Sequence, residues 1–182
     1  MKPMYLLLVM ALMGFTAKGS KPNPDVLPSG QPVSERNAQN MLPMGGDSVW
    51  NTLLQSKISY SNVAPHITAT LTPDIKKLDG KTLSADGFIL PLDASSASKH
   101  FLLSKRTPTC PFCPPGEPNE VIEVFCAKPV KVDDALVSVR GKFALTNNTD
   151  NGIFFVMKEA EVSAPATSPS GQPAGSNKPT MY

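Results

Sequence analysis

Three cysteines and two histidines are the residues of this 182-residue chain that carry thiol and imidazole groups. All three cysteines and one of the histidines lie between His100 and Cys126. Cys110 and Cys113 are separated by two residues, a spacing that can place both sulfurs on one side of a tight turn. The same spacing occurs in tetrahedral zinc sites and in dithiol redox centres. Metal binding and thiol redox chemistry are therefore the two kinds of site to weigh here.

A dithiol redox centre normally opens a helix, because the helix N-terminus lowers the pKa of the first thiol. In this chain Cys113 is followed by Pro114-Pro115-Gly116. A proline pushes the residue before it out of the helical region, so the pair is not followed by the helix that would activate it. A thiol-disulfide oxidoreductase is therefore the weaker alternative.

A closed metal site needs two ligands besides Cys110 and Cys113. His100 supplies the nearest imidazole, and Cys126 is the fourth candidate, which together would give a Cys₃His site for zinc, or for copper in its place. For each of these two residues there is an alternative to a role as metal ligand. Cys126 lies on the more apolar parity of its strand, which is typical of a buried core thiol, and His100 could be a half-buried side chain without a ligand role.

Residues 1–19 have the layout of a secretory signal peptide. Lys2 provides the basic start, an apolar run extends from Met4 to Ala17, and small residues precede Ser20. The run is too short to span a bilayer comfortably, so we expect no membrane insertion after cleavage of the signal. The sequence predicts an exported, periplasmic protein. In such an oxidising compartment, a structural disulfide between Cys110 and Cys113 is the alternative to a metal site.

The charge of the predicted mature chain argues against two classes of partner. Removal of Lys2 and Lys18 with the signal takes Lys plus Arg from 17 to 15 and leaves Asp plus Glu at 15. A formally neutral chain without a cluster of basic residues lacks the electrostatic surface that binds nucleic acid or anionic membranes. We therefore expect neither partner.

Proline-rich segments flank the region that can fold. Residues 20–46 and 163–182 combine several prolines with Ser, Asn, Gln, Gly, Ala and Thr, and contain too few large apolar residues to bury a core. We predict a disordered linker at 20–46 and a disordered tail at 163–182. The folded unit then covers residues 47–162, a length that suits one small domain.

Alternating apolar and polar residues predict short strands within that domain. The six strands are expected at 66–71, 81–92, 99–104, 121–126, 137–146 and 153–162. Short helices are expected after Asp47, with Trp50 as a core anchor, and at Thr72-Pro73. Gly87 and Gly141 inside the long strands predict a β-bulge and a bend. The pattern favours a mainly β fold, a small antiparallel barrel or sandwich of five to six strands, with the oligonucleotide/oligosaccharide-binding (OB) type of barrel as first choice.

An ordered series of short motifs runs through this region. The motifs are Leu78-Asp79-Gly80-Lys81, Gly87-Phe88-Ile89-Leu90-Pro91-Leu92, His100-Phe101-Leu102-Leu103, Cys110-Pro111-Phe112-Cys113 with Pro115-Gly116, and Val121-Ile122-Glu123-Val124. On these residues the chain resembles, over about residues 50–162, a family of small exported bacterial proteins catalogued only as a domain of unknown function. The resemblance implies a periplasmic domain, sometimes associated with transport systems, whose Cys-rich loop suggests metal binding. It implies no established activity.

The sequence thus predicts an exported β-barrel domain that is not an enzyme, since it offers no nucleophile with a base, no paired carboxylates and no phosphate loop. We expect its Cys110/Cys113 loop to bind a transition metal such as zinc or copper, as an accessory to metal uptake or envelope metal handling with an envelope or transporter protein as partner. The alternative is a structural or interaction module in which the pair is a disulfide staple.

Overall fold

The computed structural model describes residues 23–46, 48–64, 66–93, 95–110, 116–148 and 150–165. The predicted signal peptide and the C-terminal tail beyond residue 165 lie outside these residues. None of the helices in the described ranges is long and apolar enough to cross a membrane.

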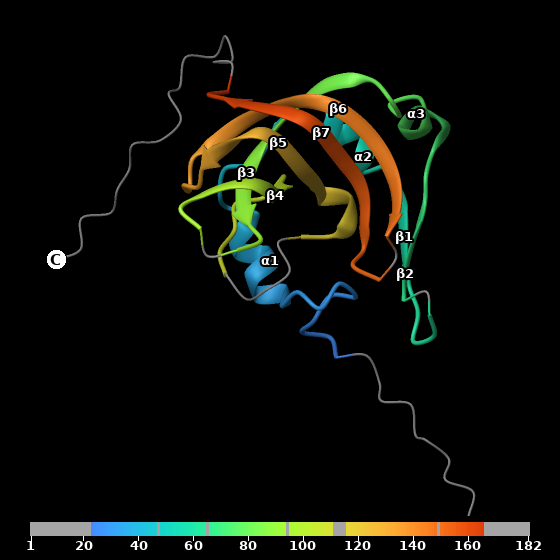
Figure 1. Cartoon of the computed structure of the whole chain (residues 1–182). Coiled ribbons are helices and arrows are strands. Elements are labelled where there is room, and N and C mark those ends of the chain that lie inside the picture. The colour runs from blue at the N-terminus through green and yellow to red at the C-terminus, as the bar shows by residue number, and fades with distance from the viewer. Residues whose placement is uncertain are drawn as a thin grey trace, which may run out of the picture.

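Five strands close into a barrel (Figure 1). They are β3 (Thr82–Pro91), β4 (Ala97–Ser104), β5 (Val121–Lys131), β6 (Leu136–Asn148) and β7 (Ile153–Ser163). Their order around the barrel is β3-β4-β5-β7-β6, with β6 returning to β3. Neighbouring strands are antiparallel except β5 and β7, which are parallel. The predicted mainly β, OB-like barrel is confirmed.

The alternating pattern of the strands produces the core. Phe101 and Leu103 of β4 are fully buried, as are Ile122 and Val124 of β5. On a strand these residues share one face, so both strands turn their large apolar side chains into the barrel. Trp50 is also fully buried, as predicted for a core anchor.

The two glycines that were expected to interrupt the strands do so differently. At Gly141 the pairing of β6 with β7 shifts register, and a Cβ there would lie 2.7 Å from the Met157 Cγ, so the glycine interrupts the regular pairing and allows a close contact with β7. At Gly87 the pairing of β3 with β6 is continuous, so the predicted bulge is wrong. A Cβ on Gly87 would lie 2.6 Å from the Ser104 carbonyl oxygen, which shows that the glycine is required by the close approach of β4 instead.

A hairpin and short helices stand beside the barrel (Figure 1). The helices are α2 (Ser48–Leu53), α3 (Pro73–Lys76) and the 3₁₀ turn η1 (Pro118–Glu120). Thr72 caps α3 as predicted, since its hydroxyl accepts the Ile75 N–H. The hairpin consists of β1 (Lys57–Tyr60) and β2 (Ile67–Thr70), which pair antiparallel. The sequence interpretation missed β1.

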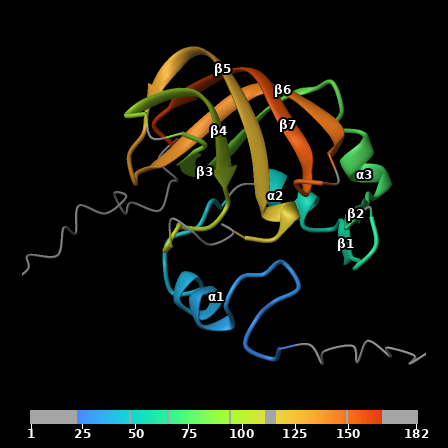
Figure 2. The ribbon, with the colours of Figure 1, turned by 60° about the horizontal axis from the view of Figure 1, so that its bottom comes forward.

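Residues 23–46 correct a second expectation. They contain helix α1 (Val33–Gln39), and Figure 2 shows α1 and the chain before it at one end of the barrel. The contacts are polar and join residues far apart in the chain. Arg36 binds Glu120, Gln39 donates to the Thr107 carbonyl and Ser29 donates to Glu117. This part of the predicted disordered linker is therefore folded against the barrel, because hydrogen bonds and ion pairs replace the apolar burial that its composition lacks.

Candidate functional site

Cys110 lies at the end of the segment that leaves β4, and its sulfur is in a disulfide. Cys113, the other half of the predicted pair, lies outside the described residues. The segment before Cys110 is held by the N-terminal region, since Thr109 donates to Glu35 at 2.7 Å and Thr107 donates to the Pro43 carbonyl at 2.6 Å. A cleft of about 440 Å³ adjoins Cys110, with Leu90 and Asp134 among its lining residues.

His100, the third predicted ligand, is already engaged on the outer side of β4. Its Nε2 lies 2.8 Å from Glu123 Oε1, and its ring stacks on Phe125 with centroids 4.3 Å apart. Both partners are on the neighbouring strand β5, where Phe125 pairs directly with His100. A metal ion at Nε2 would have to compete with the Glu123 carboxylate.

Cys126 is a free, half-buried thiol that packs against the core. It pairs with Ala160 of β7, and burial raises the pKa of its thiol. Across the ranges that the structure describes, no three side chains of His, Cys, Asp or Glu are grouped closely enough to hold a metal ion. The structure therefore does not bring His100 and Cys126 together with Cys110 into one described site.

We expect Cys126→Ala to lower the free energy of unfolding by about 1 kcal/mol, because a small, partly buried apolar contact is lost. Urea denaturation of the two proteins measures the difference. A loss several times larger would contradict the view that this thiol is a peripheral part of the core.

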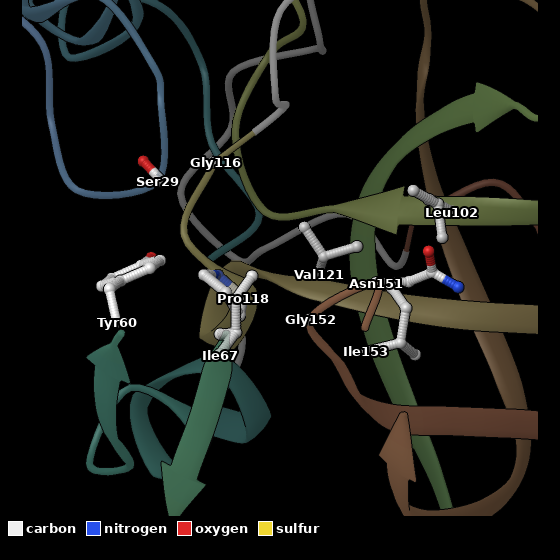
Figure 3. A pocket seen from close by; sticks show the side chains of 10 residues that line it. All are labelled: Ser29, Tyr60, Ile67, Leu102, Gly116, Pro118, Val121, Asn151, Gly152 and Ile153. Carbon is white, nitrogen blue, oxygen red and sulfur yellow. The ribbon is translucent and has the colours of Figure 1, made fainter. Parts of the chain in front are cut away.

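A second candidate site is an apolar pocket of about 200 Å³, here called the barrel-end pocket (Figure 3). It lies where the β1–β2 hairpin meets the end of the barrel at which the parallel strands β5 and β7 begin. Most of its lining is carbon, and the main contributors are Tyr60, Ile67, Leu102, Pro118, Val121 and Ile153. Ser29 and Asn151 add polar groups at its edge. Figure 3 shows Ile67 and Pro118 across the pocket from Leu102 and Ile153.

Hydrogen bonds to Glu117 fix one side of this pocket. Ser29 Oγ donates to Glu117 Oε1 at 2.8 Å, and the Tyr60 hydroxyl donates to Glu117 Oε2. The Arg36 guanidinium lies 4.0 Å from the same carboxylate. Burial, followed by the bond to Glu117, raises the pKa of the Tyr60 phenol, so the hydroxyl keeps its proton.

An ion network connects the pocket side to the N-terminal region. The Glu120 carboxylate is 5% exposed and binds Arg36 Nη1 and Arg106 Nε, each at 2.7 Å. Burial alone would raise the pKa of this carboxyl. The Glu117 N–H, Arg36 and Arg106 outweigh burial and lower the pKa below its ordinary value. The carboxylate is therefore charged and structural.

Comparison with known proteins assigns the family. The family model described as a protein of unknown function, DUF3299, matches residues 25–162. The chain belongs to the DUF3299 family. A crystal structure of a DUF3299 family protein from Pseudomonas aeruginosa PAO1 is similar at a TM-score of 0.47 and 22% identity, covering 81% of this chain and 87% of that chain. No curated protein matches this chain at a significant level. The predicted resemblance to a domain of unknown function is thus confirmed.

The sequence interpretation missed the barrel-end pocket because it missed strand β1. Ile58 and Tyr60 alternate with Lys57 and Ser59, which is a strand pattern that could have been recognised. That pattern would have placed Tyr60 in a hairpin with Ile67. It would not have shown that this hairpin lies against the starts of β5 and β7.

Proposed function

We propose that this DUF3299 protein is a periplasmic, non-catalytic binding module in which a disulfide staples the Cys110/Cys113 loop, and that its partner is a protein of the envelope. The observation that carries the proposal is the disulfide at Cys110. Thiolates, not disulfide sulfurs, act as nucleophiles and metal ligands. A bridged pair therefore closes its own short loop and leaves no thiolate for a metal ion or a substrate.

The groups with shifted pKa values support a non-catalytic role. Such groups often mark active sites. Here the raised pKa of Tyr60 and the lowered pKa of Glu120 follow from contacts between the barrel and the N-terminal region, and the raised pKa of Cys126 follows from burial. Each shift has a structural cause. The Tyr60 hydroxyl does donate to the Glu117 carboxylate, but the raised pKa keeps the proton on the phenol oxygen, so Tyr60 is not an activated nucleophile.

Metal binding by the reduced loop is the second candidate function. One observation favours it, since Asp134 lines the same cleft as Cys110 and offers a carboxylate to an ion held by that thiol. Zinc or copper bound there by Cys110 and Cys113 would suit an accessory role in metal uptake or envelope metal handling. His100 would have to leave Glu123 to join this set.

Alkylation of the denatured protein, followed by mass measurement, separates the two candidates. A staple at Cys110 consumes two of the three cysteines, so we expect one alkylated residue, Cys126, without reductant and three after reduction. Protein purified without chelator should carry no stoichiometric zinc or copper. Three alkylated cysteines without reductant, together with one metal ion per chain, would overturn the staple in favour of the metal site.

Zinc binding tests the second candidate function directly. Zinc titration of the reduced protein and of Cys110→Ser reports whether the loop binds metal once it is opened. Equal zinc affinity in the two proteins would exclude Cys110 as a ligand.

A further inference from the structure

We propose that the barrel-end pocket binds a single phenolic ring, with the ring among the apolar side chains and its hydroxyl directed at the Tyr60 oxygen. This inference rests on the proposed function, because it names the chemical group by which the binding module recognises its partner. The argument uses the size of the pocket, its lining and the direction of its hydrogen bonds.

The size of the pocket suits a ligand of one ring. An apolar cavity of about 150 Å³ is known to hold one benzene molecule. The barrel-end pocket, at about 200 Å³, has room for such a ring with one small substituent.

The lining favours an apolar, flat group. Ile67, Leu102 and Ile153 present aliphatic carbon from three separate elements, and Pro118 and Tyr60 contribute ring carbon to the lining. Contact of a ligand ring with Tyr60 and Pro118 adds dispersion energy to the removal of apolar surface from water. A sugar or a flexible polar chain would leave its hydroxyl groups without partners on these walls.

The polar edge selects a hydrogen-bond donor. Tyr60 and Ser29 both donate their hydroxyl hydrogens to Glu117, and the Ser29 hydroxyl also lies within hydrogen-bonding reach of the Tyr60 oxygen. While both hydrogens are held by Glu117, each oxygen keeps lone pairs that can only accept. Figure 3 shows the oxygen end of Tyr60 turned toward Pro118. The hydroxyl of a phenol ligand can donate to the Tyr60 oxygen. The Tyr60 hydroxyl cannot donate to the ligand in return, because its hydrogen is bonded to Glu117.

The charge around the pocket disfavours anions. Within the described chain, the residues that line the pocket include no Lys, Arg or His, and the Glu117 carboxylate lies directly behind its polar edge. A carboxylate on the ligand ring would lose water without gaining a cationic partner in the lining, because the nearest guanidinium, that of Arg36, is already held between Glu117 and Glu120. The site therefore discriminates a phenol from the benzoate of the same size.

The test uses p-cresol as the probe and the full-length oxidised protein. Toluene and p-toluate are the matched controls, since they replace the hydroxyl by hydrogen and by a carboxylate. Amide shifts of Gly116 and Gly152, which line the pocket, report binding, and those of Gly46 and Gly141, which neither line it nor adjoin a lining residue, serve as references. We expect p-cresol to bind about fivefold more tightly than toluene, the value of one added hydrogen bond. We expect no saturable shifts with p-toluate.

Variants tie the binding to this pocket. Leu102→Trp and Ile67→Trp should each fill the pocket and abolish the p-cresol shifts. The two positions lie on different elements, so the test remains possible if one of the two variants fails to fold. Leu92→Trp is the matched control, because Leu92 is 50% exposed and does not line the pocket. Tyr60→Phe should leave toluene binding unchanged and remove the preference for p-cresol.

A phenol can reach the pocket as a free small molecule or as the tyrosine side chain of a partner protein, and N-acetyl-tyrosinamide distinguishes them. Tighter binding of this amide than of p-cresol assigns the site to a tyrosine of a polypeptide, and weaker binding assigns it to a free phenol.

Binding of toluene as tight as that of p-cresol would overturn the phenol assignment but leave a binding module. Absence of shifts with every probe would overturn this inference, whereas the cysteine count tests the proposed disulfide staple independently.

Discussion

Glu120→Ala is expected to lower the free energy of unfolding by about 3 to 5 kcal/mol, the usual cost of removing one partner from a buried charge network. The substitution leaves Arg36 and Arg106 facing each other without the carboxylate, with side chains 13% and 15% exposed. It also removes the acceptor for the Glu117 N–H. Chemical denaturation at neutral pH measures the loss.

The pH dependence of this loss follows from the direction of the pKa shift. Because the pKa of Glu120 in the folded state lies below its ordinary value of 4.5, its stabilising contribution is complete above that value. The contribution disappears as the pH falls through the lowered pKa. The difference between the wild type and Glu120→Ala should therefore shrink from pH 7 to about pH 3.

Glu123→Ala is the matched control, since Glu123 is the carboxylate of β5 that binds the more exposed His100. We expect it to cost at most about 1 kcal/mol. Equal losses in the two variants would mean that the Arg36–Glu120–Arg106 network does not stabilise the fold.

Gly45→Ala should also destabilise the protein strongly, by about 2 to 3 kcal/mol, through overpacking and the disturbance of a buried hydrogen bond. A Cβ at this position would lie 2.0 Å from the Asp86 carbonyl oxygen and 2.8 Å from Trp50 Nε1. These two atoms form the 2.6 Å hydrogen bond that fixes the indole. Neither the β3 backbone nor the buried Trp50 can move away cheaply.

Gly46→Ala provides the control for backbone entropy, because a Cβ there meets nothing within 4 Å. We expect its thermal midpoint to equal or slightly exceed that of the wild type. If Gly45→Ala were as stable as Gly46→Ala, the close packing of Gly45 on the Asp86 carbonyl of β3 would be refuted.

The barrel was predictable because each strand carries its own local signal. Phe101 and Leu103 alternate with polar or outward side chains, and so do Ile122 and Val124, so the buried face can be read without knowing the neighbouring strand. Thr72 likewise predicts the start of α3, because the cap that it forms involves only the next three residues. Closure of the strands into a barrel then follows from the need to bury these faces.

The folded N-terminal region could not be predicted by the same means. Its anchors are polar, and their partners lie far away in the chain, as with Ser29 and Glu117, 88 residues apart. Proline, serine and asparagine resemble a linker by composition. Only the folded barrel presents the Glu117 and Glu120 carboxylates in the positions that give these residues binding partners.

The candidate sites show the same difference between local features, which the sequence predicts, and contacts between distant residues, which it does not. The spacing of Cys110 and Cys113 was visible in the sequence, but the competition of Glu123 for His100 depends on the register between β4 and β5. The barrel-end pocket depends on a contact between the hairpin and the barrel. Neither can be inferred from spacing along one strand.

The attachment of residues 23–46 to the barrel also bears on the order in which the protein assembles. Arg36 and Glu120 are 84 residues apart, so a chain made from its N-terminus lacks the partner of Arg36 until those residues have been added. During that interval α1 has neither an apolar core nor its ion pair to stabilise it, and an isolated helix of seven residues does not persist in water. Docking of the N-terminal region is therefore a late step, which can follow only after β4 and η1 are in place.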